Sequence, residues 1–164
     1  MDTIFCLVGP SGSGKTTVAK ALDYNVIQSY TTRPQRSEDE WGHTFVEAYK
    51  DTGDTIAYNK YNNYEYWATK AQYQGKGKTI YIIDPKGDAM LRETIDEPVV
   101  TIFLKVSEAK AFNRMCKERN YIHAQERLEY DREEFAKVRA DWVVNADRPV
   151  AEVVADVKSI MDSW

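Results

Sequence analysis

Residues 9–16 read Gly9-Pro10-Ser11-Gly12-Ser13-Gly14-Lys15-Thr16 and fit the pattern G-x-x-x-x-G-K-[ST] at every fixed position. Glycines in such a loop let backbone N–H groups converge on a phosphate, and the following helix N-terminus adds a partial positive charge. The lysine of this pattern contacts the β- and γ-phosphates of a nucleotide, and the threonine hydroxyl binds Mg²⁺. We therefore predict an ATP-binding loop whose contacts come from Gly9, Ser11, Gly12, Ser13, Gly14, Lys15, Thr16 and Thr17.

The segments around this loop alternate between strand and helix patterns. Residues 4–8 form a short apolar run, typical of a strand buried on both faces, and a helix is expected over 15–22. Further strands are predicted over 25–30, 79–83, 99–104 and 142–144, and further helices over 86–95, 107–119, 124–138 and 150–161, the last capped by Asp147. This alternation predicts an α/β fold with a parallel sheet of the P-loop NTPase type, flanked by helices.

A segment rich in Tyr, Thr and Val interrupts the alternation. Six of the 11 tyrosines lie between Tyr49 and Tyr73. The pattern over 44–67 is typical of β-strands, with turn residues at 62–63, and a short helix is expected over 68–74. We predict that this segment forms a small mixed-β insertion on one side of the sheet.

Composition excludes some other classes of protein. The 164 residues include 22 basic and 26 acidic side chains, and the resulting net charge of −4 argues against a nucleic-acid coat protein. No apolar run approaches the length of a membrane span, so no membrane association is expected. Cys6 and Cys116 show no metal-ligand spacing and are predicted to be buried thiols of a reduced, cytoplasmic protein. The oligomeric state is not predicted.

The phosphate loop alone does not identify the reaction, because GTPases, motor ATPases and kinases all use it. A GTPase would carry an N-K-x-D motif, which the sequence lacks. A kinase needs a second anion site facing the γ-phosphate, and arginines are well suited to bind phosphate. Arg33 and Arg36, in the stretch Ser29-Tyr30-Thr31-Thr32-Arg33-Pro34-Gln35-Arg36, are predicted to form that site for an acceptor phosphate.

Several motifs, in this order, resemble the guanylate kinase family. The phosphate loop, S-Y-T-T-R-P-Q-R over 29–36 and W-G-H-T-F-V over 41–46 are similar to the family's Walker loop, S-x-T-T-R-x-x-R and G-x-x-Y-x-F-V motifs. Y-W-A-T over 66–69, I-I-D-P-K-G over 82–87 and V-N-A-D over 144–147 extend the resemblance to nearly the whole chain. The resemblance implies ATP- and Mg²⁺-dependent phosphorylation of a (deoxy)nucleoside monophosphate, such as GMP, dGMP or a related base, to the diphosphate.

The resemblance also implies roles for individual side chains. The residues implied at the acceptor phosphate are Arg33, Arg36, Asp39, His43 and Tyr66. Those implied at the acceptor base and sugar are Ser29, Asp84 and the position of Ala68, and Asp84 would also reach Mg²⁺ through water. Tyr58 is predicted at the acceptor base as a stacking residue of the tyrosine-rich segment, not from the resemblance. Arg114, Arg119 and Arg127 would close over the transferring phosphoryl group and act in catalysis with Lys15 and Arg33, while Asn145 would lie near the ATP adenine.

Three positions depart from the family where guanine is read. Ala57 stands in place of a Glu, Ile82 in place of the first Asp of D-I-D, and Ala68 in place of the Ser of Y-G-S-T. Guanine carries N1–H and N2–H₂ donors, and each donor left unpaired on burial costs about 1–3 kcal/mol. Two hypotheses stay open: a different base read by the tyrosines and asparagines of residues 58–64, or guanine read by Glu47 or Glu65.

We expect one nucleotide-kinase domain over 1–164. It would consist of a core of about 1–30 and 78–164, an acceptor-binding insertion of about 31–77, and a short helical lid of about 114–128. One alternative is a P-loop kinase whose acceptor is a non-guanine nucleotide, a modified base or a nucleic-acid end. A second alternative is a guanylate-kinase-like binding module without catalysis. Apart from such an acceptor, no nucleic-acid partner is expected.

Overall fold

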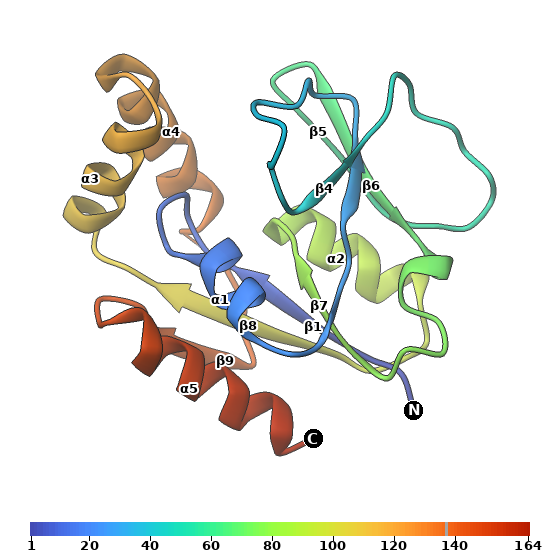
Figure 1. Cartoon of the computed structure of the whole chain (residues 1–164). Coiled ribbons are helices and arrows are strands. Elements are labelled where there is room, and N and C mark those ends of the chain that lie inside the picture. The colour runs from blue at the N-terminus through green and yellow to red at the C-terminus, as the bar shows by residue number, and fades with distance from the viewer. Residues whose placement is uncertain (137) are drawn as a thin grey trace.

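A parallel sheet of five strands forms the centre of the protein in a computed structural model that describes residues 1–136 and 138–164 (Figure 1). Its strands are β1 (Thr3–Val8), β2 (Asn25–Val26), β7 (Lys78–Ile82), β8 (Val99–Lys105) and β9 (Trp142–Asn145), in the spatial order β2-β7-β1-β8-β9. Since β1 is the central strand, the phosphate loop leaves the sheet at its carboxyl edge, where open α/β sheets bind their ligands.

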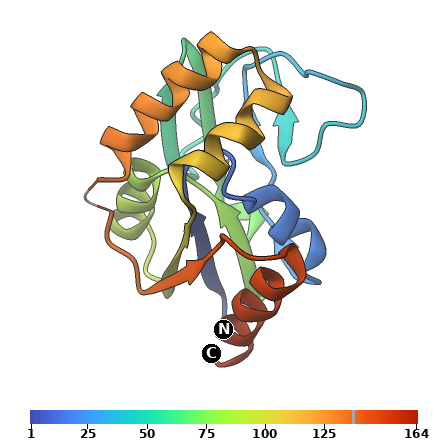
Figure 2. The same ribbon diagram turned by 90° about the vertical axis from the view of Figure 1, so that its left-hand side faces the viewer.

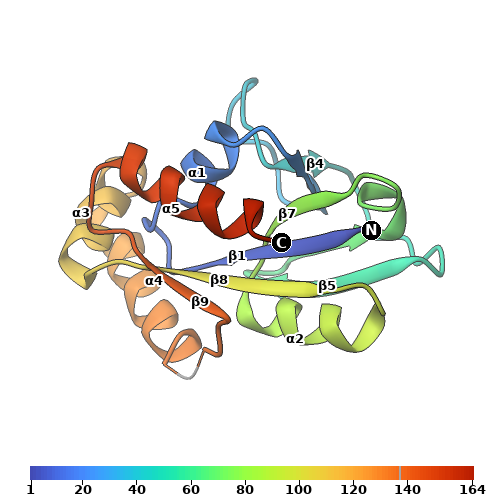
Figure 3. The same ribbon diagram turned by 90° about the horizontal axis from the view of Figure 1, so that it is seen from below.

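Helices cover both faces of this sheet (Figure 3). The helices α1 (Lys15–Ala21) and α5 (Val150–Asp162) lie on one face, and α2 (Pro85–Thr94) lies on the other. Beyond the carboxyl ends of the strands, α3 (Glu108–Glu118) and α4 (Tyr121–Glu134) pack against each other as a pair (Figure 2). This pair is therefore on the same side of the sheet as the phosphate loop.

The sequence of β1 explains why helices are needed on both faces. All six of its residues are buried. Phe5 and Leu7 join a core with residues of α1 and α5, whereas Ile4 and Cys6 join a second core with residues of α2. Successive side chains of β1 point to opposite faces of the sheet, and helices cover each face, so every apolar side chain of the run is buried.

A second sheet of four strands lies beside the first, in the order β4-β3-β6-β5. Its strands are β3 (Ser29–Thr31), β4 (His43–Phe45), β5 (Thr55–Tyr61) and β6 (Tyr64–Thr69), and a single 3₁₀ turn, Lys70–Gln72, follows β6. The sheet is mixed, because β3 pairs in parallel with β4 and antiparallel with β6. The β5–β6 hairpin turns at Asn62 and Asn63, whose φ angles of 54° and 67° suit asparagine better than most residues.

The predicted fold class is confirmed: a parallel sheet flanked by helices, with a small mixed-β sheet beside it. Two element predictions were wrong. The expected strand over 25–30 is divided, because β2 ends at Val26 in the central sheet and β3 begins at Ser29 in the second sheet. The expected short helix over 68–74 is reduced to the 3₁₀ turn Lys70–Gln72, because β6 continues to Thr69 in register with β5.

Two further predictions about single residues were also wrong. Asp147 does not cap α5. Its carboxylate instead accepts a hydrogen bond from the backbone N–H of Ser107 at 3.0 Å, which connects the segment after β9 to the start of α3. Cys6 is buried as predicted, but Cys116 lies exposed on α3. Among the helices of the described residues, none has both the length and the apolar character that crossing a membrane requires.

Candidate functional site

The phosphate loop adopts a conformation that only its glycines permit. Gly14 has φ 92° and stands directly before α1, so the chain can turn sharply into the helix. Gly12 has φ 81°, and a Cβ atom there would lie 2.7 Å from the carbonyl oxygen of Ala111. The Lys15 ammonium donates to the carbonyl oxygens of Gly9 and Pro10. The loop is therefore a compact cradle with its lysine folded across it.

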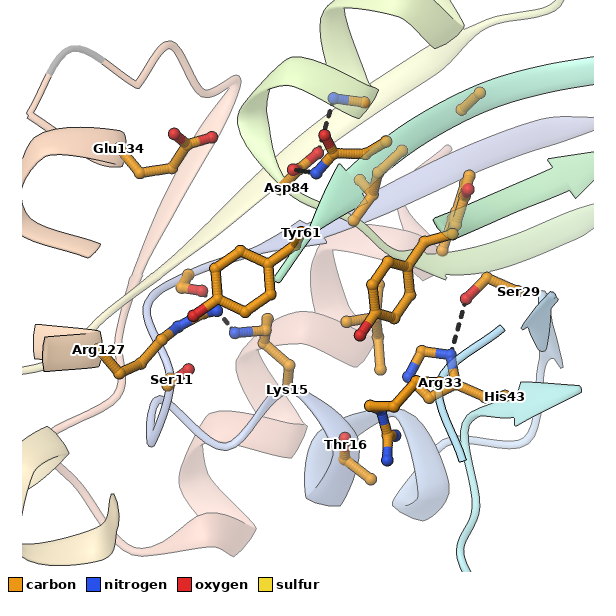
Figure 4. Close-up of a pocket in the computed structure, with 18 of the residues that line it drawn as sticks. Ser11, Lys15, Thr16, Ser29, Arg33, His43, Tyr61, Asp84, Arg127 and Glu134 are labelled. Carbon is orange, nitrogen blue, oxygen red and sulfur yellow. Dashed lines mark hydrogen bonds between the residues drawn. The ribbon is translucent and has the colours of Figure 1, made fainter. Parts of the chain in front are cut away.

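One cleft of about 340 Å³ runs from this loop to the second sheet (Figure 4). Its walls come from the loop, the second sheet, the end of β7 and the helix α4. Among the residues predicted as functional, those that line it are Gly9, Ser11, Lys15, Thr16, Ser29, Arg33, Arg36, His43, Tyr58, Tyr66, Asp84, Arg119 and Arg127. Segments distant in sequence thus bring two groups of cationic side chains to one space.

The cleft end next to the second sheet is basic. Arg33 has a side chain only 10% exposed and forms an ion pair with Glu40 at 2.8 Å, and Glu40 also accepts from the backbone N–H of Arg36. The attraction of Arg33 overcomes burial and lowers the pKa of Glu40. We predicted a carboxylate beside these arginines at Asp39, but Asp39 is exposed and Glu40 holds the position.

His43 contributes a neutral polar group to the same end of the cleft. Its Nδ1 shares a hydrogen bond of 2.9 Å with the Ser29 hydroxyl. Burial and the positive charge of Arg33 lower the pKa of His43, so the imidazole is mainly uncharged at neutral pH. A neutral ring can donate one hydrogen bond to a ligand without adding charge.

Polar side chains between the two ends of the cleft are already paired. The Tyr58 hydroxyl donates to the Glu65 carboxylate at 2.7 Å, which raises the pKa of Tyr58 to about 12. Asp84 caps α2 by accepting from the backbone N–H of Gly87 at 2.7 Å, and it also accepts from the Asn59 amide. Burial raises the pKa of the Asp84 carboxyl despite these hydrogen bonds. These pairs leave a preformed wall of hydroxyl, amide and carboxyl groups.

The lid side carries two arginines that face the phosphate loop. Burial and the adjacent Arg127 lower the pKa of Arg119, whose Nε atom is buried with no hydrogen-bond partner among the described residues. Burial would also lower the pKa of Arg127, but the Asp131 carboxylate more than offsets that effect and the pKa is raised. Two neighbouring guanidinium groups, whose Nε atoms both lack a hydrogen-bond partner among the described residues, form a site suited to an anion.

The remaining predicted residues lie outside the cleft walls. Arg114 donates to the carbonyl oxygen of Gly12 at 2.7 Å and so contacts the phosphate loop from the α3 side. Ala68 is fully buried opposite Ala57, and Asn145 accepts from the backbone N–H of Asp147. Gly12, Ser13, Gly14 and Thr17 belong to the loop or the first turn of α1 without lining the cavity. Arg114 therefore contacts the loop itself rather than the space where a phosphoryl group would lie.

Several cleft residues were not predicted from the sequence. Tyr130 and Glu134 enter from α4, and Ile83 and Gly87 follow β7. Of the tyrosines between Tyr49 and Tyr73, only Tyr58, Tyr61 and Tyr66 line the cleft. Spacing along α4 could have found the two α4 residues, because Tyr130 and Glu134 lie three and seven positions after Arg127 and share its helix face.

The environment of Lys15 predicts a pH dependence of nucleotide binding. Burial lowers the pKa of the Lys15 ammonium to about 8, although Asp131 opposes the shift. The ammonium is therefore mostly present below pH 8 and is lost as the pH rises above it, so affinity for a triphosphate should fall by about fivefold from pH 8 to pH 9. Calorimetric titration with ATP would measure this decline, and the variant Lys15→Arg, which stays charged, should flatten it. A constant affinity for the unsubstituted protein between pH 7.5 and 9.5 would contradict the expectation.

Comparisons with known proteins agree with this geometry. No family model matches the chain. The guanylate kinase of Mycoplasma genitalium is 28% identical over an alignment 178 positions long, which covers 96% of this chain and 74% of the relative. A crystal structure of guanylate kinase from Anaplasma phagocytophilum superposes with a TM-score of 0.72 at 20% identity, over 99% of this chain and 85% of that chain. A gluconokinase from Sinorhizobium meliloti 1021 superposes with a TM-score of 0.57 at 16% identity, over 99% and 93% of the two chains.

The matches differ in what they establish. The structural similarity to proteins of 20% identity or less shows the shared fold. The sequence match extends along nearly the whole chain, as the order of motifs does. The predicted resemblance to the guanylate kinase family is thus confirmed.

Proposed function

We propose that this protein is a kinase that transfers the γ-phosphoryl group of ATP to a (deoxy)nucleoside monophosphate. One observation carries the proposal: a single cleft joins a complete phosphate loop to a second, separate cluster of arginines. A triphosphate at the loop and a monophosphate at Arg33 and Arg36 would then meet within one enclosed space. Such a geometry provides the proximity that phosphoryl transfer requires.

The donor end of the cleft would bind ATP. Backbone N–H groups of the loop and the N-terminus of α1 favour phosphate, and Lys15 would swing from the carbonyl oxygens of Gly9 and Pro10 to the β- and γ-phosphates. We further propose that Asn145, at the end of β9, lies near the adenine. Lys15 would neutralise charge on the triphosphate that repels the acceptor.

Mg²⁺ fits two oxygen donors of the cleft, one in the phosphate loop and one at the end of β7. The Thr16 hydroxyl and the Asp84 carboxylate both line the cleft, and Mg²⁺ typically takes one or two protein oxygens together with water and phosphate oxygens. We propose that Thr16 holds the ion directly and Asp84 through water. When bound, the ion would neutralise negative charge on the phosphates.

The acceptor end would bind the monophosphate through Arg33, Arg36, His43 and Tyr66. Arg33 is fixed by Glu40, so its guanidinium is already oriented before the ligand arrives. The acceptor oxygen is a phosphate oxygen that already carries negative charge, and no general base is needed to activate it. We therefore assign His43 to phosphate binding.

The lid arginines would complete the transfer. Arg119, at the C-terminal end of α3, and Arg127 on α4 line the cleft, and both act electrostatically on Lys15, so charge on the transferring group would be surrounded by cations. Closure of the lid pair would exclude the water that otherwise hydrolyses ATP. On this proposal the insertion of about 31–77 binds the acceptor and the lid of about 114–128 covers it.

The comparisons support a nucleotide-binding kinase, because the sequence relative is a guanylate kinase. The intact loop, with Lys15 and Thr16 both facing the cleft, favours catalysis over a binding module. A cytoplasmic location is proposed from the free thiols alone.

The base of the acceptor is the feature that the cleft specifies least. Ala57 and Ile82 give this wall apolar side chains where the resemblance implies guanine-reading carboxylates. Glu47 is exposed, whereas Glu65 reaches the cleft only through the Tyr58 hydroxyl. We propose a permissive or non-guanine site, with GMP and dGMP as the main competing acceptors.

A panel of acceptors tests this proposal. ADP release would be measured with ATP, Mg²⁺ and the ribo- and deoxy-monophosphates of all common bases, with a 5′-hydroxyl oligonucleotide as the nucleic-acid acceptor. We expect transfer to at least one monophosphate, a preference for guanine of less than about tenfold because paired acceptors are missing, and no transfer to the oligonucleotide.

Two results would contradict these expectations. ADP release equal to the ATP-only background for every acceptor would favour the binding module. Activity with GMP and dGMP alone would show that Ala57 and Ile82 do not relax the base site. Ala57→Glu, compared with Ala57→Gln of equal size, should raise the relative activity with guanine nucleotides if the missing carboxylate is the cause.

A further inference from the structure

Asp131 is a buried carboxylate that joins the lid to the phosphate loop. It lies on α4 with only 2% of its surface exposed. One carboxylate oxygen accepts from the backbone N–H of Ser11 at 2.8 Å, across a separation of 120 residues. The other lies 3.0 Å from Nε of Arg127, one helical turn earlier on α4. The side chain thus bridges a loop residue that lines the cleft and a lid arginine that lines it too.

A buried carboxylate is stable only beside groups that compensate its charge. The groups that compensate Asp131 are the Ser11 N–H and the Arg127 guanidinium, and both residues line the cleft. Nε of Arg127 and Oδ1 of Asp131 lie at ion-pair distance, but neither atom has a hydrogen-bond partner among the described residues, so their contact is electrostatic and the guanidinium keeps its N–H donors for a ligand. The hydrogen bond from the Ser11 N–H to Asp131 holds α4 at a short distance from the phosphate loop. Asp131 is therefore placed to attract the Arg127 guanidinium and to keep it close to the phosphate loop.

Two aromatic rings hold Arg127 from its other sides. Its guanidinium carbon lies 4.5 Å from the ring centre of Tyr61 and 5.0 Å from that of Tyr130, and the two rings are 4.9 Å apart. Tyr61 comes from the β5–β6 hairpin, so the arginine also contacts the second sheet (Figure 4). Arg127 is consequently located by the loop, the lid and the second sheet together.

We propose that Asp131 is a positioning residue for phosphoryl transfer, which holds Arg127 in register with the phosphate loop so that its guanidinium meets the transferring group. This inference rests on the proposed kinase function. Asp131 itself would contact neither substrate. Its contribution would act through Arg127, and it should therefore vanish when Arg127 is absent.

A purely structural role for Asp131 is the competing explanation, and the chain offers a matched control. Asp88 on α2 is also a buried carboxylate, and it lies 3.0 Å from Nε of Arg92 on the next turn of the same helix. It accepts from the Thr101 hydroxyl at 2.6 Å and lines no part of the cleft. Asp88→Asn therefore disrupts a buried carboxylate with the same helical spacing to its arginine, at a site that lies outside the cleft.

The test is a double-mutant cycle in the full chain, using the best acceptor from the panel. Arg127→Ala should lower kcat by about 100-fold, and Asp131→Ala should lower it by about tenfold with both KM values within about threefold. The double variant should be no slower than Arg127→Ala alone. Asp131→Asn keeps an oxygen for the Ser11 N–H but loses the charge, so it should lower kcat less than alanine does. Asp88→Asn should lower the melting temperature and leave kcat unchanged.

Three outcomes would overturn the proposal. The first is losses that multiply in the double variant, and the second is an unchanged kcat in Asp131→Asn and Asp131→Ala alike. The third is a kcat loss in Asp88→Asn as large as that in Asp131→Asn, which would indicate a general effect of destabilisation. Should Asp131→Ala fail to fold, the cycle is completed with Asp131→Asn. Failure of the kinase proposal is distinct, since the unsubstituted protein would then transfer phosphate to no monophosphate.

Discussion

Replacing Lys15 by alanine is expected to lower the rate of phosphoryl transfer by about 1,000-fold, the largest effect of any single substitution proposed for this protein. The ammonium is the cation of the phosphate loop itself, and it lines the cleft opposite Arg127. Its neighbours in the loop contribute backbone dipoles, which cannot follow charge as it moves to the leaving ADP. Removing the ammonium also lowers the positive charge of the cleft that would offset the charge of the phosphates.

The measurement is kcat with saturating ATP and acceptor, together with a calorimetric Kd for ATP. Lys117→Ala removes an exposed lysine from α3 and should leave both quantities unchanged. Because Lys15 also bonds to the carbonyl oxygens of Gly9 and Pro10, the melting temperature of each variant must be compared. A well-folded Lys15→Ala protein with undiminished kcat would refute the kinase mechanism.

The central fold could be predicted from sequence because its signals are local. An apolar run at residues 4–8, followed at once by the loop glycines, specifies a buried strand, a tight turn and a helix start within about a dozen residues. The tyrosine-rich segment was likewise recognisable as β-structure, and Asn62-Asn63 as its turn. Each of these predictions depends on neighbours in the chain, which a sequence displays directly.

The predictions were wrong where contacts between distant parts of the chain determine the local structure. The segment 25–30 has one continuous β pattern, yet two sheets share it, because the chain crosses from the central sheet to the second at Ile27 and Gln28. Asp147 has the sequence position of a helix cap, but the backbone N–H of Ser107, 40 residues away, is its partner. Local propensity offered no means of weighing these distant groups.

The residues of the candidate site also fall into two groups, those that the sequence predicts and those that only the tertiary structure reveals. Lys15, Thr16, Arg33 and Arg36 could be predicted, because their motifs are contiguous. The choice of Glu40 over Asp39 depends on which acidic side chain turns inward, and the link from Asp131 to Ser11 depends on how α4 crosses the loop. Half of the tyrosines between Tyr49 and Tyr73 face the cleft and the rest pack elsewhere, as Tyr49 does against Trp67. Composition alone could not separate these two uses.

Replacing Arg33 by alanine is expected to raise KM for the acceptor by about 150-fold, equivalent to about 3 kcal/mol, while KM for ATP stays within about threefold. Arg33 is almost wholly buried and is held by Glu40, so its charge acts in a medium less polar than water. Its removal deletes a charge-assisted contact to the monophosphate and leaves the Glu40 carboxylate unpaired beside the incoming anion. Both effects weaken acceptor binding and neither reaches the phosphate loop.

Steady-state kinetics with each substrate varied in turn would separate these two KM values. Lys158→Ala is the control, because Lys158 forms an ion pair with Asp162 on the surface of α5, away from the cleft, where the loss of such a pair costs little. Glu40→Gln should raise the acceptor KM by less than tenfold, since it frees Arg33 without deleting it. If Arg33→Ala raised the two KM values equally, the arginine would serve the cleft as a whole and the separate acceptor site would be refuted. If instead only the acceptor KM rises, and Glu40→Gln restores part of the affinity when combined with Arg33→Ala, the carboxylate left unpaired accounts for that part of the loss.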